Sequence, residues 1–206
     1  MAVSPMQLKV KPSPAPPAPY AGPVVLAMGF RFFFLLAGGW AVIAMGVWLL
    51  LLEGFWTSAS YLPAVWLHGH EMIFGFLAAA AAGFLLTAVP GWTEQPKLRG
   101  WPLAGLALVW LAGRGVMSGV VVDSPMVMAL VDLAFLPLLT LAIALPVWRS
   151  GAHHQWTFPL LMALLWLGNL LFHLEALERV REMGMMGLYL GVDAMVMVMV
   201  AFGGKM

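Results

Sequence analysis

Long apolar stretches separated by short polar segments make up most of this chain after residue 23. Each stretch has about 20 residues, enough for an α-helix to cross the roughly 30 Å hydrocarbon core of a bilayer. The stretches are too long and too uniformly apolar for barrel strands, and backbone groups in lipid must be paired within one segment. The pattern therefore predicts an all-α fold, a polytopic membrane helix bundle with six transmembrane helices. The expected spans are residues 32–52, 72–90, 102–122, 126–147, 157–176 and 184–204.

The composition supports a membrane protein. Of the 206 residues, 63% are hydrophobic and only 9% are charged, and the mean hydropathy is +0.94. A soluble domain of this length could not hide so much apolar surface, so the lipid bilayer is the first expected partner. No basic patch for nucleic acid is present. The chain has no cysteine, which leaves imidazole, carboxylate or thioether groups as metal ligands.

Residues 1–23 differ in kind, because they hold seven of the 15 prolines and show little hydrophobic periodicity. They are expected to form a disordered, proline-rich tail, and residues 24–206 a six-helix transmembrane domain. The lysines and arginines favour cytoplasmic termini, since seven then lie in inside segments and three in outside segments. The seven are Lys9, Lys11, Arg31, Lys97, Arg99, Arg149 and Lys205, and the three are Arg114, Arg179 and Arg181.

With this topology, the ionisable residues of the spans gather toward the outer surface. Ionisable groups inside a membrane are costly and usually functional, so these side chains predict an outward-opening polar site. The expected members are His68, His70 and Glu71 at the start of the second helix, Arg114 in the third, Asp132 in the fourth, His173 at the end of the fifth and Asp193 in the sixth.

His70 and His173 are expected at one depth on different helices, as an axial pair for a planar macrocycle requires. His68 is two residues from His70, so the two side chains diverge if both are helical. Asn169 lies one turn before His173 and could orient its imidazole. Structural roles remain open, because Glu71 could complement the helix dipole.

Arg114 could pair with Asp132 or Asp193, since an unpaired charge in the membrane is costly. On that reading these residues form a buried polar network whose role is structural.

Several motifs together resemble the NnrS family. They are Gly29-Phe30-Arg31-Phe32-Phe33-Phe34, His68-Gly69-His70-Glu71-Met72, Gly83-Phe84-Leu85-Leu86-Thr87-Ala88-Val89-Pro90, Ala112-Gly113-Arg114, Asp132-Leu133-Ala134-Phe135-Leu136-Pro137, and Asn169 with His173. The resemblance implies a bacterial cytoplasmic-membrane protein that contains haem b and copper, without an established catalytic reaction. It implies a role in denitrification and protection against nitric oxide. The ligands that it implies are His68, His70 and His173.

The chain departs from the family pattern in two respects. Phe32 stands where the family usually has proline, and family members look about twice as long, with further histidines in a second half. The chain could then be a natural short form, a fragment, or a subunit, and in the last case a homo-oligomer or a second membrane subunit is an expected partner. Two rival functions follow: a transport or ion-binding module that uses the outward-facing polar site, and a structural or assembly subunit without a cofactor.

Overall fold

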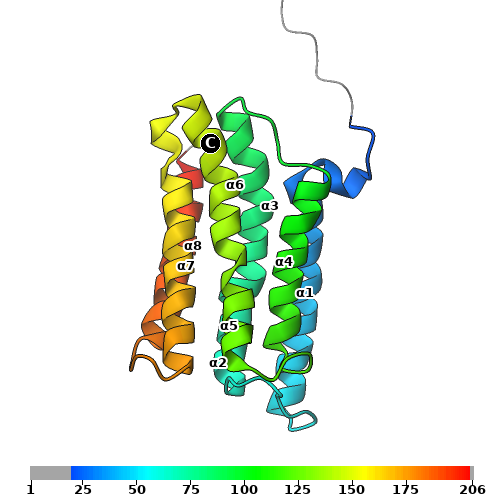
Figure 1. Cartoon of the computed structure of the whole chain (residues 1–206), viewed down its shortest axis with the longest axis vertical. Helices are drawn as coiled ribbons and strands as arrows, with labels where there is room; N and C mark the ends of the chain where they lie inside the picture. The colour runs from blue at the N-terminus through cyan, green and yellow to red at the C-terminus, as the bar shows by residue number, and fades with distance from the viewer. Residues whose placement is uncertain (1–19, 205–206) are drawn as a thin grey trace, which may run out of the picture.

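A computed structural model describes residues 20–204, so residues 1–19 of the expected tail lie outside the described part. Within 20–204 the chain forms helices and connecting loops without a strand, which confirms the all-α bundle (Figure 1). The elements are η1 (Val24–Ala27), α1 (Gly29–Leu52), α2 (Ala64–His70), η2 (Glu71–Leu77), α3 (Ala78–Trp92), α4 (Trp101–Met117), α5 (Pro125–Leu133), α6 (Phe135–Ser150), η3 (His153–Gln155), α7 (Thr157–Ala176) and α8 (Gly184–Gly203).

Five helical stretches of the described residues are long and apolar enough to cross a membrane. The remaining expected span, residues 102–122, corresponds to α4, which is apolar but has only 17 residues. It ends at Met117 and not at residue 122, because Ser118 and Gly119 form a turn in which Gly119 has a φ of 74°. Glycine adopts this left-handed conformation without steric cost, so the dipeptide stops the helix.

The second span begins earlier than the sequence predicts. It starts at Ala64, directly after Pro63, and α2, η2 and α3 continue to Trp92 as one rod of 29 residues. The polar motif at 68–71 does not interrupt the rod, because His70 and Glu71 find partners inside the bundle. The central segment, η2, is a π-helix, a local widening that is frequent at functional sites.

The fourth span is divided at Ala134 into α5 and α6. Pro137 has no N–H, so it cannot donate to the carbonyl of Leu133 as a continuous helix requires. The indole of Trp166 on α7 donates to that carbonyl at 3.2 Å instead. The substitute bond keeps the backbone group satisfied in an apolar setting.

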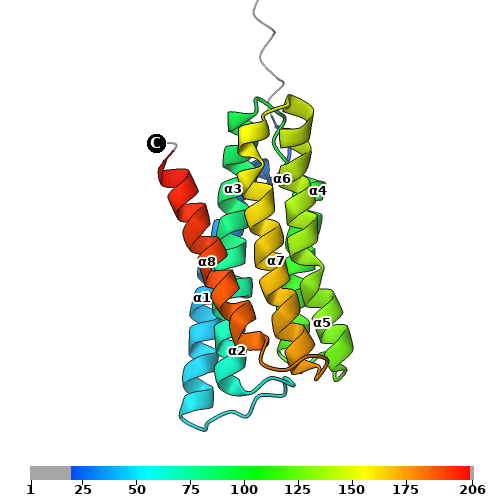
Figure 2. The ribbon, with the colours of Figure 1, turned by 90° about the vertical axis from the view of Figure 1, so that its left-hand side faces the viewer.

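Helix α3 lies in the middle of the bundle, packed between α1 and α6. At the edge of the bundle away from α1 and α4 in Figure 1, α8 packs along α7 (Figure 2). Gly168 and Gly187 meet there, and a Cβ on either would clash with the carbonyl of the other, so only glycine permits this approach. The C-terminal end of α8 lies at the same end of the bundle as η1, and the α1–α2, α4–α5 and α7–α8 connections lie at the other end (Figure 1).

Candidate functional site

Six of the residues singled out in the sequence meet inside the bundle, near the end where the α1–α2 loop lies. Each is at most 6% exposed. They are His70 at the end of α2, Glu71 at the start of η2, Arg114 on α4, Asp132 on α5, and Asn169 and His173 on α7. Four separate rods therefore contribute to one buried polar cluster.

Asp132 stands at the centre of this cluster. Its Oδ2 lies 3.2 Å from Nε2 of His70 and 3.1 Å from Nε2 of His173, and it accepts a hydrogen bond of 2.7 Å from the amide of Asn169. Its Oδ1 forms an ion pair with Arg114. One carboxylate thus joins α2, α4 and α7.

The remaining nitrogen of each imidazole has its own partner. Nδ1 of His70 lies 3.1 Å from Oε1 of Glu71, and Nδ1 of His173 lies 2.6 Å from the hydroxyl of Tyr61. Partners of this kind fix the ring orientation and leave Nε2 to face inward, as the outer partners of metal-bound histidines do. Both Nε2 atoms therefore point at the same place, beside Oδ2 of Asp132.

Tyr61 lies in the loop between α1 and α2, outside the spans. Burial raises the pKa of its phenol above the usual tyrosine value of about 10, and the negative charge of Asp132 raises the pKa further. The hydroxyl therefore keeps its proton and can either donate to His173 Nδ1 or accept from it. It suits both tautomers of that ring.

Glu71 and Arg114 form the second half of the cluster. Their ion pair has an N–O distance of 2.7 Å, and Oε2 of Glu71 also accepts a hydrogen bond of 2.8 Å from the indole of Trp40. These groups converge over Gly75, where a Cβ would stand 2.7 Å from the Arg114 guanidinium and 2.9 Å from the Glu71 carboxylate. Gly75 therefore makes room for the pair.

The ionised groups carry one excess negative charge, because Glu71 and Asp132 face a single guanidinium, that of Arg114. The imidazole of His70 lies where a positive charge would balance this excess. Its Nε2 faces oxygens of both Asp132 and Asn169, and its Nδ1 faces Glu71, so a neutral ring would direct one lone pair at an oxygen. A second proton on the ring, or a cation beside Nε2, removes the contact between the lone pair and the oxygen. It also balances the buried negative charge, which is otherwise costly.

The site has the dimensions of a metal centre. One donor atom each from His70, Asp132 and His173 lies within 4.8 Å of the others. Two imidazoles and one carboxylate form a donor set typical of first-row transition metals. Phe74 and Phe172 pack on the His70 ring with centroid distances of 5.2 and 5.1 Å, which keeps water away.

Two expectations from the sequence need correction, and one is confirmed. Asp193 is not a member of the buried network: it is exposed on α8, because the buried positions of that helix form a separate stripe toward α7. Arg114 pairs with Asp132, one of its two expected partners, and also with Glu71. Glu71 is not in the first turn of a helix, since the rod begins seven residues earlier.

His68 also lies apart from the cluster. Its ring stacks on Trp48 of α1, with centroids 4.4 Å apart and planes inclined by 18°. Residues two apart on a helix point in different directions, so His68 turns toward α1 when His70 turns toward α7.

Tyr61, Trp40 and Gly75 were not singled out from the sequence as site residues. Tyr61 is one of only three tyrosines and precedes the histidine motif by seven residues, which could have marked it. Trp40 and Gly75 carry no comparable signal, because tryptophan and glycine are common in membrane helices for other reasons.

Comparison with known proteins identifies one family. The family model described as NnrS protein matches residues 24–206, which is nearly all of the described bundle. No curated protein and no solved structure matches the chain.

Proposed function

We propose that this chain, which belongs to the NnrS family, binds a transition metal ion between His70, Asp132 and His173 and acts in nitric oxide physiology. It is a multi-pass membrane protein by its apolar helices. We further propose that it resides in the bacterial cytoplasmic membrane with both termini inside, and that it serves denitrification or protection against nitrosative stress, as the family resemblance implies.

One observation carries the metal assignment. Two buried imidazoles direct Nε2 at the same carboxylate oxygen, and each ring is held from behind by another side chain. The excess negative charge of the cluster favours an added cation at this point. A structural histidine needs neither a second imidazole nor a shared carboxylate.

Copper is the ion that we propose. A site of nitrogen and oxygen ligands binds Cu²⁺ more tightly than the other divalent ions of the first row. Copper held there would supply a one-electron couple and an open coordination position for a small neutral ligand such as nitric oxide. The protein contributes the rest: Tyr61 and Glu71 orient the imidazoles, Arg114 balances charge, and Phe74 and Phe172 exclude water.

Haem b, which the resemblance also implies, does not fit between His70 and His173 in this arrangement. Axial ligands must face each other across the plane of a large ring, but here both Nε2 atoms converge on Asp132, and the ring centroids are 5.2 Å apart. Asn169 fills the remaining contact of His70. The geometry supports an ion in place of the axial haem pair expected from the sequence.

The polar-path alternative finds less support. A transport route needs ionisable or hydrated groups along its length. Among the described residues the buried charged side chains are Glu71, Arg114 and Asp132, all in the one cluster. The buried positions of α3, which lead toward the other end, are alanine, glycine, leucine, valine and proline.

Metal content tests the proposal. Full-length protein purified in detergent after growth with copper should contain about one copper ion per chain by elemental analysis. His70→Ala and His173→Ala should each lose most of it, whereas His68→Ala, the same change two residues away, should retain it. Copper retained in both cluster variants, or a Soret band that both variants abolish, would contradict the proposed ion site.

Physiology needs a separate measurement. Cells that lack their own copy and express the wild-type chain should recover faster from a nitric oxide donor than cells that express His173→Ala at equal level. Equal recovery would remove the nitric oxide role and leave the metal site standing.

A further inference from the structure

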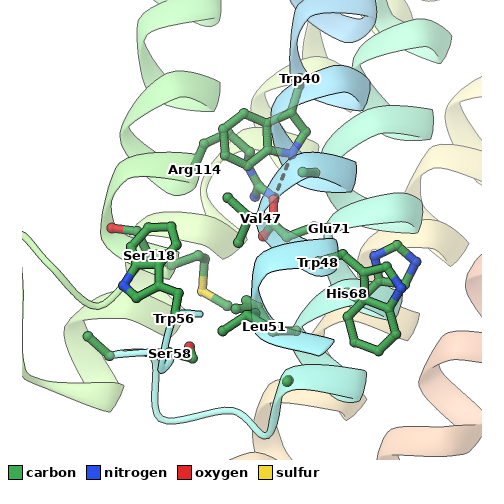
Figure 3. Close-up of a pocket in the computed structure, with 15 residues that line it drawn as sticks. Trp40, Val47, Trp48, Leu51, Trp56, Ser58, His68, Glu71, Arg114 and Ser118 are labelled. Carbon is green, nitrogen blue, oxygen red and sulfur yellow. Dashed lines mark hydrogen bonds and ion pairs between the residues drawn. The ribbon is translucent and has the colours of Figure 1, made fainter. Parts of the chain in front are cut away.

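A pocket lies beside the buried polar cluster, between α1, α2, α4 and the α1–α2 loop (Figure 3). Its cavity volume is about 80 Å³, and the wider space that also includes open solvent is about 610 Å³. Three indoles line it, those of Trp40, Trp48 and Trp56, and Glu71 and Arg114 lie at its inner end. Indoles at a largely apolar hollow favour a flat, mainly apolar ligand.

The walls of this pocket carry unmet hydrogen bonds. In the described part of the chain, two buried side-chain atoms lack a hydrogen-bond partner: Nε of Arg114 and Nδ1 of His68. Both residues line the pocket, and they enter it from different helices, α4 and α2. Buried polar atoms are nearly always satisfied, so two orphans at one pocket indicate a ligand with two polar atoms.

The pocket also limits the charge of its ligand. The Arg114 guanidinium is already paired with Glu71 and Asp132, so no cation is left to balance an acid. Nε of Arg114 can only donate, which requires an acceptor oxygen on the ligand, whereas Nδ1 of His68 can donate or accept. An uncharged ring with an oxygen atom at each end meets these conditions, whether the two oxygens are carbonyls or hydroxyls.

Access runs through the seam between α1 and α4. Helix α1 packs mainly against α3 and η2, and α4 mainly against α5, so few backbone positions of these two pocket walls approach each other outside the ring contact of Trp40 with Trp110. Ile43 and Leu50 of α1, next to the lining positions on that helix, are exposed toward lipid. A ligand dissolved in the membrane can therefore enter sideways.

From these features we propose that the pocket binds the ring of a membrane-soluble para-quinone or quinol. The ring lies among the indoles with one oxygen toward Arg114 and the other toward His68, and its alkyl tail remains in the open seam. A cavity of about 150 Å³ encloses benzene; this cavity is smaller, at about 80 Å³, so part of the ring lies in the open mouth. Both orphan atoms are covered in the free protein, and binding therefore includes a small turn of each side chain.

Fluorescence titration of the full-length protein in nanodiscs tests this site. Decylubiquinone should quench tryptophan emission in a saturable way, and decylbenzene, which has the ring and tail without oxygens, should compete at least tenfold more weakly. His68→Phe keeps the stacking on Trp48 but removes Nδ1, so it should weaken binding about fivefold, the worth of one net hydrogen bond.

Matched substitutions on α1 separate the pocket from the lipid surface. Ala44 is a buried lining residue, so Ala44→Phe should abolish saturable quenching, whereas Val42→Phe, on the exposed face of α1 away from the pocket, should leave it unchanged. Unsaturable quenching in the wild type, equal competition by decylbenzene, or wild-type affinity in both His68→Phe and Ala44→Phe would overturn the proposal. The copper content of each variant reports its folding, and the copper site does not depend on this result.

Discussion

Asp132→Asn is the substitution that the structure makes most informative, because it removes one charge with little change of shape. The carboxylate forms one ion pair with Arg114 and contacts His70, Asn169 and His173. Removal of one partner from a buried ion pair costs about 3–5 kcal/mol, and an interhelical hydrogen bond in a membrane averages about 0.6 kcal/mol. The variant also removes the excess negative charge and leaves the Arg114–Glu71 pair intact. We therefore expect the lower end, a loss of about 3 kcal/mol.

Unfolding in mixed micelles of dodecylmaltoside and increasing sodium dodecyl sulfate measures this loss. Asp193→Asn is the matched control: it is the same chemical change, but Asp193 is exposed on α8 and has no buried partner. It should alter the free energy of unfolding by less than about 0.5 kcal/mol. A double-mutant cycle between Arg114→Gln and Asp132→Asn should give a coupling of about 1–3 kcal/mol. Equal losses for Asp132→Asn and Asp193→Asn, or additive losses in the cycle, would refute the assignment of Asp132 as the partner of Arg114.

Three further predictions follow from other parts of the structure. Cysteines placed at the exposed positions Thr57 and Lys97 should differ in intact cells, with labelling by an impermeant reagent at Thr57 alone; labelling at Lys97 alone would reverse the topology. The pKa of Tyr61 is raised in the folded protein, so stability should be lost as pH rises above about 10, where the unfolded phenol ionises; Tyr61→Phe should show a shallower loss in thermal unfolding, and an identical pH profile would contradict the burial of this phenol. Gly75→Ala should cost about 1–3 kcal/mol by displacing the Arg114–Glu71 pair, whereas Gly39→Ala on open surface should be neutral or slightly stabilising in the same assay.

Hydropathy was sufficient to predict the fold, because in a bilayer the length of an apolar stretch nearly determines the element that it forms. The errors occurred where tertiary contacts decide the boundary. The second rod starts at Ala64 because His70 and Glu71 find partners inside the bundle, and a hydropathy window cannot detect such partners. The division at Ala134 was readable from Pro137, but the indole of Trp166 that compensates for it comes from another helix.

Only some of the residues that form the site could be predicted from the sequence. Depth along each helix could be counted from the sequence, and it placed His70, Arg114, Asp132 and His173 near one end. Which atoms meet depends on the rotation of each helix about its own axis, and hydropathy does not give that rotation. For this reason the counted depth was compatible with an axial haem pair, whereas the structure joins both imidazoles through Asp132.

Asp132 and Asp193 show which additional signal the sequence contained. Both lie in apolar helices at a similar counted depth, so hydropathy treats them alike. Helix α8, however, carries Gly184, Gly187 and Gly191 at spacings of three and four, and small residues at these intervals mark the face that approaches another helix. Asp193 follows Gly191 by two residues and therefore points away from that face, as the structure finds. The direction of the small-residue stripe, combined with depth, separates a lipid-facing carboxylate from one that can reach the cluster.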